Sequence, residues 1–204
     1  MIRFMKVIAL TGGIATGKST AMDMLLEMDS NIAMYDCDRG ARKWMEDGET
    51  IREVELALEE ELTTRDGGVN REKLRKLVFD NPELRRKLEG IIHPKLRKEC
   101  LEKVAECRMN QRTTLFVADV PLLFENGFDL GQELQLVVAT SEVTQRARLK
   151  TRSRFDDRMI SSILSAQLPI MEKVARADVV FWNEGKRSAL KRQLSRFLDY
   201  LYHS

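Results

Sequence analysis

Residues 12–19 read Gly-Gly-Ile-Ala-Thr-Gly-Lys-Ser and match G-x-x-x-x-G-K-[ST], the phosphate-binding loop of nucleoside triphosphatases and small-molecule kinases. The apolar run before them, residues 6–10, suits a buried parallel strand. In the segment after them, apolar residues recur at helical spacing. A strand, a phosphate loop and a helix in this order constrain the fold more than any other feature, and they predict an α/β protein that binds a nucleoside triphosphate.

The residue types of this loop explain how it would hold phosphate. Glycines let the backbone turn so that several N–H groups point at phosphate oxygens, and the following helix adds its positive N-terminal end. A lysine supplies a cation to the outer phosphates, and the hydroxyl after it suits Mg²⁺. The residues expected to bind ATP are Gly13, Ile14, Ala15, Thr16, Gly17, Lys18, Ser19 and Thr20, with Ser19 as the metal ligand.

Four further apolar runs suit buried strands, and helical patterns separate them. They cover residues 31–35, 114–118, 134–140 and 178–182. Strands that alternate with helical crossovers predict a five-stranded parallel sheet with helices on both faces, the P-loop kinase fold. The long interval between the second and third strands is mostly helical. One of its helices is expected to start at Asn81-Pro82 and to break at Pro94.

This pattern predicts three parts. A nucleotide-binding core is expected at 1–40, 112–141 and 177–204, a helical acceptor-binding subdomain at 41–111, and a lid at 142–176. The C-terminal helix has one apolar face, which suits docking against the core better than a membrane surface.

Composition limits the class of protein. The chain has 204 residues, a net charge of +2 and three cysteines without a C-x-x-C pair, and no apolar run approaches the roughly 20 residues of a membrane span. We therefore expect a cytoplasmic protein without a nucleic-acid or membrane partner, present as a monomer or a weak homo-oligomer.

Polar residues follow several expected strands, at the sheet edge where such folds bind ligands. They are Asp36 and Asp38, Asp119 and Asn183. If the second strand continues past residue 36, Asp36 and Asp38 point to the same side, because side chains alternate along a strand. One of them suits a base for an acceptor hydroxyl, and the position at the end of a strand favours this role, although an aspartate here also suits a helix cap or a turn.

A basic segment lies between the fourth and fifth strands. Residues 145–155 contain five cations and no acid, and a helix would place Arg148 and Arg152 on one face. The segment suits either a solvated helix or a mobile lid that brings cations to the phosphates of ATP.

Several motifs together resemble the dephospho-coenzyme A kinase family, from the first strand to about Gly185. They are Leu10-Thr-Gly-Gly-Ile14, Asp36-Cys-Asp38 with Arg42, Leu88-Glu-Gly-Ile-Ile-His-Pro94, Val120-Pro-Leu-Leu-Phe-Glu125, Gln167, Lys173, Ala177-Asp178 and Asn183-Glu-Gly185. The motifs around His93, Glu125 and Asn183 distinguish this family from adenylate and shikimate kinases.

The resemblance implies that ATP phosphorylates the 3′-hydroxyl of the dephospho-coenzyme A ribose, the last step of coenzyme A biosynthesis. It implies that Asp36 is the base and that Lys18 and Arg148 are catalytic. The other implied contacts are Asp38, Arg42, His93 and Glu125 at the acceptor, Arg148 and Arg152 at the phosphates, and Asn183 and Gly185 beside adenine. His93 also suits a helix break, where backbone groups would satisfy it.

Several residues depart from the family pattern, and the segment Arg154-Phe-Asp-Asp-Arg158 is also unusual for it. Ser153 stands where aspartate is common, Cys37 replaces a small alanine, and Ala15 replaces a common glycine, which should be tolerated if φ is negative there. Two other function classes share some of these features. One is another nucleoside or nucleotide kinase with a P-loop, and the other is a nucleotide-dependent switch or nucleic-acid binder, which the small net charge disfavours.

Overall fold

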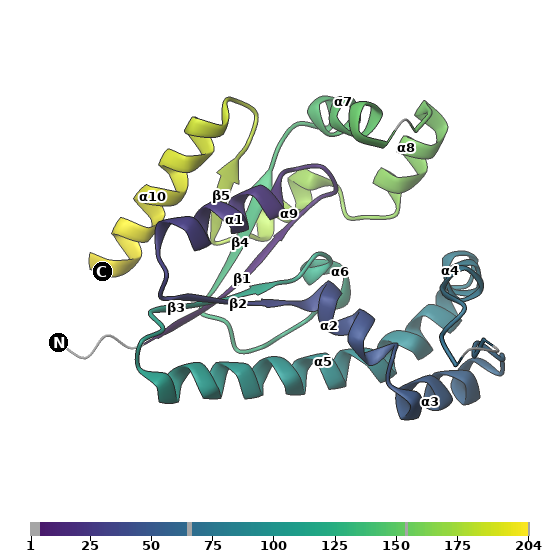
Figure 1. The fold of residues 1–204 in the computed structure, drawn as a ribbon. Helices are drawn as coiled ribbons and strands as arrows, with labels where there is room; N and C mark the ends of the chain where they lie inside the picture. The colour runs from purple at the N-terminus through teal and green to yellow at the C-terminus, as the bar shows by residue number, and fades with distance from the viewer. Residues whose placement is uncertain (1–4, 65–66, 154, 204) are drawn as a thin grey trace. The chain divides into compact units, whose positions relative to one another are not determined.

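The computed structural model of the chain describes residues 5–64, 67–153 and 155–203. The chain forms two compact units, one made of Met1–Tyr35 with Val104–Ser204 and the other of Asp36–Lys103. The first unit contains nearly all of the sheet, and the second is mainly helical (Figure 1). The expected division into core, acceptor subdomain and lid remains a prediction.

The sheet has five strands in the order β2-β3-β1-β4-β5. They are β1 (Lys6–Gly12), β2 (Ile32–Asp36), β3 (Leu115–Asp119), β4 (Leu134–Ala139) and β5 (Val179–Trp182). β1 lies between β3 and β4 and pairs with both in parallel, and β5 pairs in parallel with β4. The expected parallel sheet of the P-loop kinase fold is therefore confirmed.

Helices connect these strands. In the unit that holds the sheet they are α1 (Lys18–Met28), α6 (Leu123–Asn126), α7 (Glu142–Ser153), α8 (Asp157–Ser165), α9 (Ile170–Arg176) and α10 (Arg187–His203). In the other unit they are α2 (Cys37–Trp44), α3 (Gly48–Leu58) and α4 (Arg71–Asp80), while α5 (Pro82–Asn110) crosses the boundary in sequence. Of the helices in the described ranges, none has both the length and the apolar character that a membrane span requires.

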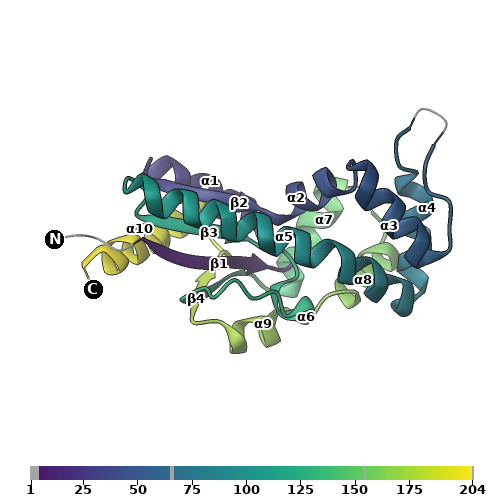
Figure 2. The ribbon, with the colours of Figure 1, turned by 90° about the horizontal axis from the view of Figure 1, so that it is seen from below.

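The core of the first unit lies between the sheet and the pair α1 and α10. Ile8 and Leu10 of β1 pack in one apolar cluster with residues of β3, β4, β5 and both helices. Val7 and Ala9 alternate with them and are also buried, as expected for a parallel strand with both faces covered. Helix α9 packs against β4, on the other side of the sheet from α1 (Figure 2). The connection from β1 to β2 and that from β4 to β5 run in opposite directions along the sheet, so right-handed crossovers place their helices on opposite faces.

The second unit has its own small core. Val54, Leu58 and Leu62 are buried there, with Leu74, Leu77, Leu84 and Leu88 among the residues packed around them. Polar caps start its helices: Asp47 accepts from the N–H of Thr50, Asn70 from that of Lys73, and Asn81 from that of Leu84. The predicted helix start at Asn81-Pro82 is confirmed.

The predicted break at Pro94 is wrong, because α5 continues through this residue to Asn110. A proline inside a helix loses one hydrogen bond and costs about 3 kcal/mol. The apolar stripe of Ile92, Leu96, Cys100 and Val104 runs at four-residue intervals past Pro94, and all four side chains are buried. Their burial, at about 1.5–3 kcal/mol for each large side chain, outweighs the cost of the proline.

Candidate active site

The phosphate loop connects the end of β1 to the start of α1, as the motif predicts. Gly17 precedes the helix with φ 95°, in the left-handed region that favours glycine. A Cβ at Gly12 would lie 2.7 Å from the carbonyl oxygen of Val138, and a Cβ at Gly13 would lie 2.7 Å from Nε2 of Gln145. Backbone conformation therefore requires glycine at 17, and the Val138 backbone requires it at 12. At 13, a larger residue would have to displace the Gln145 amide.

Ala15 does not meet the condition of a negative φ under which alanine would replace glycine without strain, because its φ is 59°. An L-residue in the left-handed region costs about 1–2 kcal/mol, since its Cβ approaches the carbonyl oxygen. The chain thus keeps a conformation that glycine would adopt without strain. Contacts from residues outside the loop must therefore offset the strain of this Ala15 conformation.

The peptide groups on both sides of Ile14 are held by side chains. The N–H of Ile14 donates to Oε1 of Gln167 at 2.9 Å, and its carbonyl accepts from Nε2 of Gln145 at 2.6 Å. The carbonyl of Gly13 points the other way and accepts from both the N–H of Thr16 at 3.3 Å and its hydroxyl at 2.9 Å.

The next two carbonyls are held by Arg148 and Asn183. Nη1 of Arg148 donates to the carbonyls of Ala15 and Thr16, at 3.1 Å each, and Nη2 donates to that of Asn183 at 2.8 Å. Nδ2 of Asn183 donates to Thr16 at 2.8 Å. Because the C=O and N–H of one peptide point in opposite directions, outward carbonyls leave the N–H groups of Ala15 and Gly17 directed inward, as an anion site needs.

Lys18 lies at the first position of α1 and forms an ion pair with Asp119, the last residue of β3. Both side chains are largely buried, at 16% and 12% exposed. The pair brings a cation and a carboxylate to the end of the loop. A cation beside the loop suits a phosphate ligand, and the carboxylate suits a metal ion or a hydrogen-bonded water.

Ser19 and Thr20 follow Lys18 in the first turn of α1, and the side chain of Ser19 is exposed. Arg152 lies near the end of α7 with an exposed side chain and has no ion-pair partner among the described residues. Arg154, the last cation of the basic segment, lies outside these residues. In the parts of the chain that are described, no three histidine, cysteine or acidic side chains gather to hold a metal by themselves.

Glu125, in α6, contacts the segment that carries Gln167. Its Oε1 accepts from the N–H of Leu168 at 3.0 Å and lies 2.7 Å from Nζ of Lys173, which is fully buried. This contact is an ion pair without hydrogen-bond geometry, and Oε2 of Glu125 is buried without a hydrogen-bond partner among the described residues. One carboxylate oxygen of Glu125 is therefore engaged inside the protein.

Glu184 joins the turn after β5 to the start of α7. Its carboxylate accepts from the N–H and hydroxyl of Ser141, at 2.8 and 2.7 Å, from the hydroxyl of Thr140 at 2.5 Å, and from the hydroxyl of Thr144. The N–H of Ser141 and the three hydroxyls lower the pKa of Glu184 to about 2. Asn183 and Gly185, the residues expected beside adenine, are the sequence neighbours of Glu184. The same segment after β5 therefore carries all three residues.

Asp36, Asp38 and Arg42 lie where β2 passes into α2. The strand does not continue past residue 36, because α2 begins at Cys37. Oδ1 of Asp36 accepts from the N–H of Arg39 at 2.9 Å, which is the helix cap that the sequence left open. Aspartate at an N-cap satisfies a free backbone donor, which explains why the strand ends here. Asp38 and Arg42 are exposed on α2, four residues apart.

His93 lies within α5 rather than at a helix break, and its side chain is partly buried. Burial lowers the pKa of His93, and the nearby Glu89 carboxylate raises it by less. The imidazole is therefore mainly neutral near pH 7.

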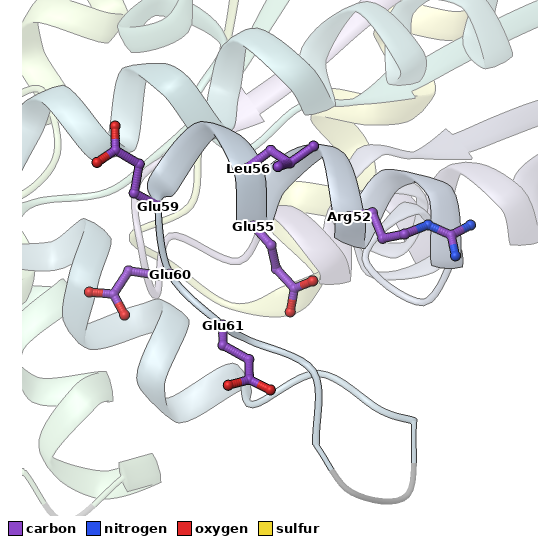
Figure 3. Close-up of a pocket in the computed structure, with 6 residues that line it drawn as sticks. All are labelled: Arg52, Glu55, Leu56, Glu59, Glu60 and Glu61. Carbon is purple, nitrogen blue, oxygen red and sulfur yellow. The ribbon is translucent and has the colours of Figure 1, made fainter.

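A shallow pocket of about 500 Å³ lies on the helical unit (Figure 3). Its wall consists of Arg52, Glu55, Leu56, Glu59, Glu60 and Glu61. Four carboxylates would repel a nucleotide, and Oε1 of Glu55 already accepts from the N–H groups of Leu62 and Thr63. This pocket is not a candidate for ATP.

Sequence reasoning missed three residues that contact or support the loop. Asp119 had a signal, because it follows a buried strand, but it was assigned no role. Glu184 lies inside the Asn183-Glu-Gly185 motif but was assigned no role. Gln145 had no signal of its own, since an amide that binds a backbone group far along the chain looks like any surface residue.

The chain is similar to known dephospho-CoA kinases along nearly its whole length. The family model for dephospho-CoA kinase matches residues 6–189. A dephospho-CoA kinase of Geobacillus kaustophilus is 38% identical over 193 residues and 94% of each chain. One of Bacillus anthracis is 36% identical over 193 residues, with 94% of this chain and 95% of the relative covered.

Solved structures share the fold of the chain. A crystal structure of a Thermus thermophilus protein superposes with a TM-score of 0.81 at 29% identity and covers 97% of this chain and 98% of its own. A dephospho-CoA kinase from Campylobacter jejuni, 24% identical, shares the fold with a TM-score of 0.68 over 95% of both chains. Given the family match from β1 into α10, the chain belongs to the dephospho-CoA kinase family of ATP-dependent kinases.

Proposed function

We propose that this protein transfers the γ-phosphoryl group of ATP to the 3′-hydroxyl of the ribose of dephospho-coenzyme A. The observation that carries the proposal is the family match over residues 6–189, which includes the phosphate loop and all five strands. In the reaction, a bond forms between the 3′-oxygen and the γ-phosphorus while the bond from that phosphorus to the bridging oxygen breaks. ADP leaves, and the hydroxyl proton passes to a base.

The phosphate loop is the proposed site for the triphosphate. The inward N–H groups of Ala15 and Gly17 and the N-terminus of α1 would bind phosphate oxygens. Lys18 would release Asp119 or bind it and phosphate together. Its cation would then stabilise the negative charge on the outer phosphates, which shifts to the leaving oxygen during transfer. Catalysis here rests on position and charge rather than on a covalent intermediate.

The basic segment has two proposed roles. Arg148 is engaged with three backbone carbonyls of the loop and of Asn183, so its cation would act at the phosphate site while it holds the loop in shape. Arg152 is exposed and free of ion pairs within the described parts of the chain, and it would reach the phosphates when the lid closes. Asn183 and Gly185 would lie beside adenine.

Mg²⁺ is a proposed cofactor. The hydroxyl of Ser19 is exposed in the first turn of α1, and Asp119 supplies a carboxylate beside Lys18, so the donor set is oxygen, as this ion prefers. When bound, the ion would neutralise charge on the phosphates, with water and phosphate oxygens as its other ligands.

Asp36 is the proposed base. Its Oδ1 caps α2, and its Oδ2 has no hydrogen-bond partner among the described residues, which leaves one oxygen to take the hydroxyl proton. Asp38, Arg42, His93 and Glu125 are proposed to position the acceptor. For Glu125 this role would need a rearrangement of its carboxylate, because Oε1 binds Leu168 and Oε2 is buried.

We also propose that the protein works in the cytoplasm as a monomer or weak homo-oligomer, without nucleic acid. Within the described residues, Cys37, Cys100 and Cys107 form no disulfide, as in a reducing compartment.

Release of ADP from ATP, Mg²⁺ and dephospho-coenzyme A tests the function. Coenzyme A is the matched control, because its 3′-position already carries phosphate and cannot accept another. We expect ADP with dephospho-coenzyme A only. Equal ADP release with both compounds, or faster release with nucleosides or nucleotides, would overturn the proposal in favour of another kinase or a hydrolase.

A further inference from the structure

The two glutamines that bind Ile14 come from different parts of the chain. Gln145 belongs to α7 and is buried, at 3% exposed, while Gln167 lies in the turn between α8 and α9. A backbone N–H only donates and a carbonyl only accepts. The orientation of both amides is therefore fixed: Gln145 donates through Nε2, and Gln167 accepts through Oε1.

Each glutamine controls a different peptide of the loop. Gln145 binds the carbonyl of the peptide between Ile14 and Ala15, so the N–H of Ala15 must point the opposite way. Gln167 binds the N–H of the peptide between Gly13 and Ile14, so the carbonyl of Gly13 points to Thr16. Only the first of these peptides presents an N–H group to a phosphate ligand.

The strain at Ala15 makes this peptide the weak point of the loop. Rotation of the peptide between Ile14 and Ala15 would let φ of Ala15 change from 59° to a negative value and would relieve the strain. The same rotation would turn the N–H of Ala15 away from the phosphates and separate the Ile14 carbonyl from Gln145. The hydrogen bond from Gln145 opposes this rotation.

Both glutamines are themselves held in place. Nε2 of Gln145 lies where a Cβ on Gly13 would reach within 2.7 Å, so the glycine leaves room for the amide. The turn that carries Gln167 is fixed by the bond from the N–H of Leu168 to Glu125, which pairs with the buried Lys173.

From this geometry we infer that Gln145 is a positioning residue for ATP: it keeps the N–H of Ala15 directed at the phosphates although the backbone of Ala15 is strained. Gln167 fixes the neighbouring peptide and bears less directly on the ligand. This inference rests on the proposed function only in taking ATP as the ligand of the loop.

Two variants that add the same negative charge distinguish the effect of losing the Gln145 hydrogen bond from the effect of the charge itself. Gln145→Glu removes the donor and places a carboxylate oxygen against the Ile14 carbonyl. Gln167→Glu adds the same charge at the same residue of the loop but keeps an acceptor for the Ile14 N–H. Both variants are measured in the full-length protein by calorimetric titration with Mg²⁺-ATP and no acceptor, and then by steady-state kinetics.

We expect Gln145→Glu to bind ATP about tenfold more weakly than Gln167→Glu, because a buried carbonyl loses its donor. The KM for dephospho-coenzyme A should stay within about twofold of the wild type. Adding Ala15→Gly to Gln145→Glu should restore part of the binding, because glycine adopts the positive φ without strain and rotation of the peptide then relieves nothing. Gln145→Met, uncharged and of similar length, tests the same bond if Gln145→Glu does not fold.

Equal loss of ATP binding in the two glutamate variants would overturn the inference, because charge alone would then explain the effect. Normal ATP binding by Gln145→Met would also overturn it. The titration contains no acceptor, so failure of the acceptor assay with the wild type would remove the proposed function and leave this result unaffected.

Discussion

Nζ of Lys173 lies 2.7 Å from Oε1 of Glu125, with the lysine side chain fully buried and the glutamate 15% exposed. The same oxygen accepts from the N–H of Leu168, so this pair anchors the turn that carries Gln167. An ammonium without water around it depends on its one carboxylate partner, which makes the pair sensitive to the loss of either member.

Lys173→Met should lower the free energy of unfolding by about 3 kcal/mol or more, because it leaves a buried carboxylate without its cation. Equilibrium unfolding in urea measures the change. Adding Glu125→Gln removes both charges and should recover part of the loss. A double variant no more stable than the single one would assign the loss to packing. Lys76→Met, at the exposed pair with Glu72, is the control and should change stability by less than about 1 kcal/mol.

The carboxylate of Glu184 predicts an acid-dependent loss of stability. Its hydrogen bonds from Ser141, Thr140 and Thr144 lower the pKa from 4.5 to about 2, so the folded state favours the charged form. A lowered pKa stabilises the fold above the ordinary value, and this contribution is lost as the pH falls from about 4.5 towards 2. Glu184→Gln should therefore be less stable than the wild type at pH 7, with a difference that shrinks below pH 4.5. Unfolding midpoints across this range measure it, and a constant difference would exclude titration of Glu184 as the cause.

Ala15 and Gly13 predict opposite effects of exchanging alanine and glycine. Ala15→Gly should raise stability by about 0.5–1 kcal/mol, because glycine adopts a positive φ without strain, and this exceeds the entropy that glycine adds to the unfolded chain. Gly13→Ala should instead weaken ATP binding, since its Cβ would lie 2.7 Å from Nε2 of Gln145. Thermal unfolding and ATP titration of both variants measure these changes. A loss of stability in Ala15→Gly would mean that the alanine side chain packs favourably in the loop.

The variant Asp36→Asn tests the proposed role of Asp36 as a base separately from its role as the cap of α2. Asparagine accepts the N–H of Arg39 as well as aspartate does, so α2 should keep its start. It cannot take a proton at neutral pH, and we expect turnover to fall about 10²–10⁴-fold while the Kd of ATP stays unchanged. Steady-state turnover and calorimetry measure the two quantities. Unchanged turnover would remove Asp36 from the role of base and leave it as a cap.

The fold could be predicted from the sequence because its signals are local. Each buried strand is a short apolar run, and the loop between β1 and α1 follows a fixed pattern, so the order of elements follows from them. Pro94 misled because its local effect opposes a helix, whereas the buried stripe through Ile92 and Leu96 favours one. The burial of this stripe in the folded protein outweighs the local effect of proline, so the helix continues. A short stretch of sequence does not show how well those side chains are packed.

The site could be predicted only in part, for the same reason. The loop residues and Lys18 carry their chemistry in a contiguous motif. The partners of the loop do not: Gln145 and Ile14 are 131 residues apart, and Arg148 and Ala15 are 133 apart. A left-handed φ at Ala15 is equally invisible, because it depends on those distant side chains and not on the alanine itself.

The bonds that Gln145, Gln167 and Arg148 make with the phosphate loop all involve main-chain atoms of the loop. Every amino acid except proline offers the same peptide group, so the side chain at position 14 is not what these three residues recognise. Natural variation should therefore be freer at Ile14 than at the distant glutamines and arginine, and the shape of the phosphate site is encoded largely outside the motif by which it is detected.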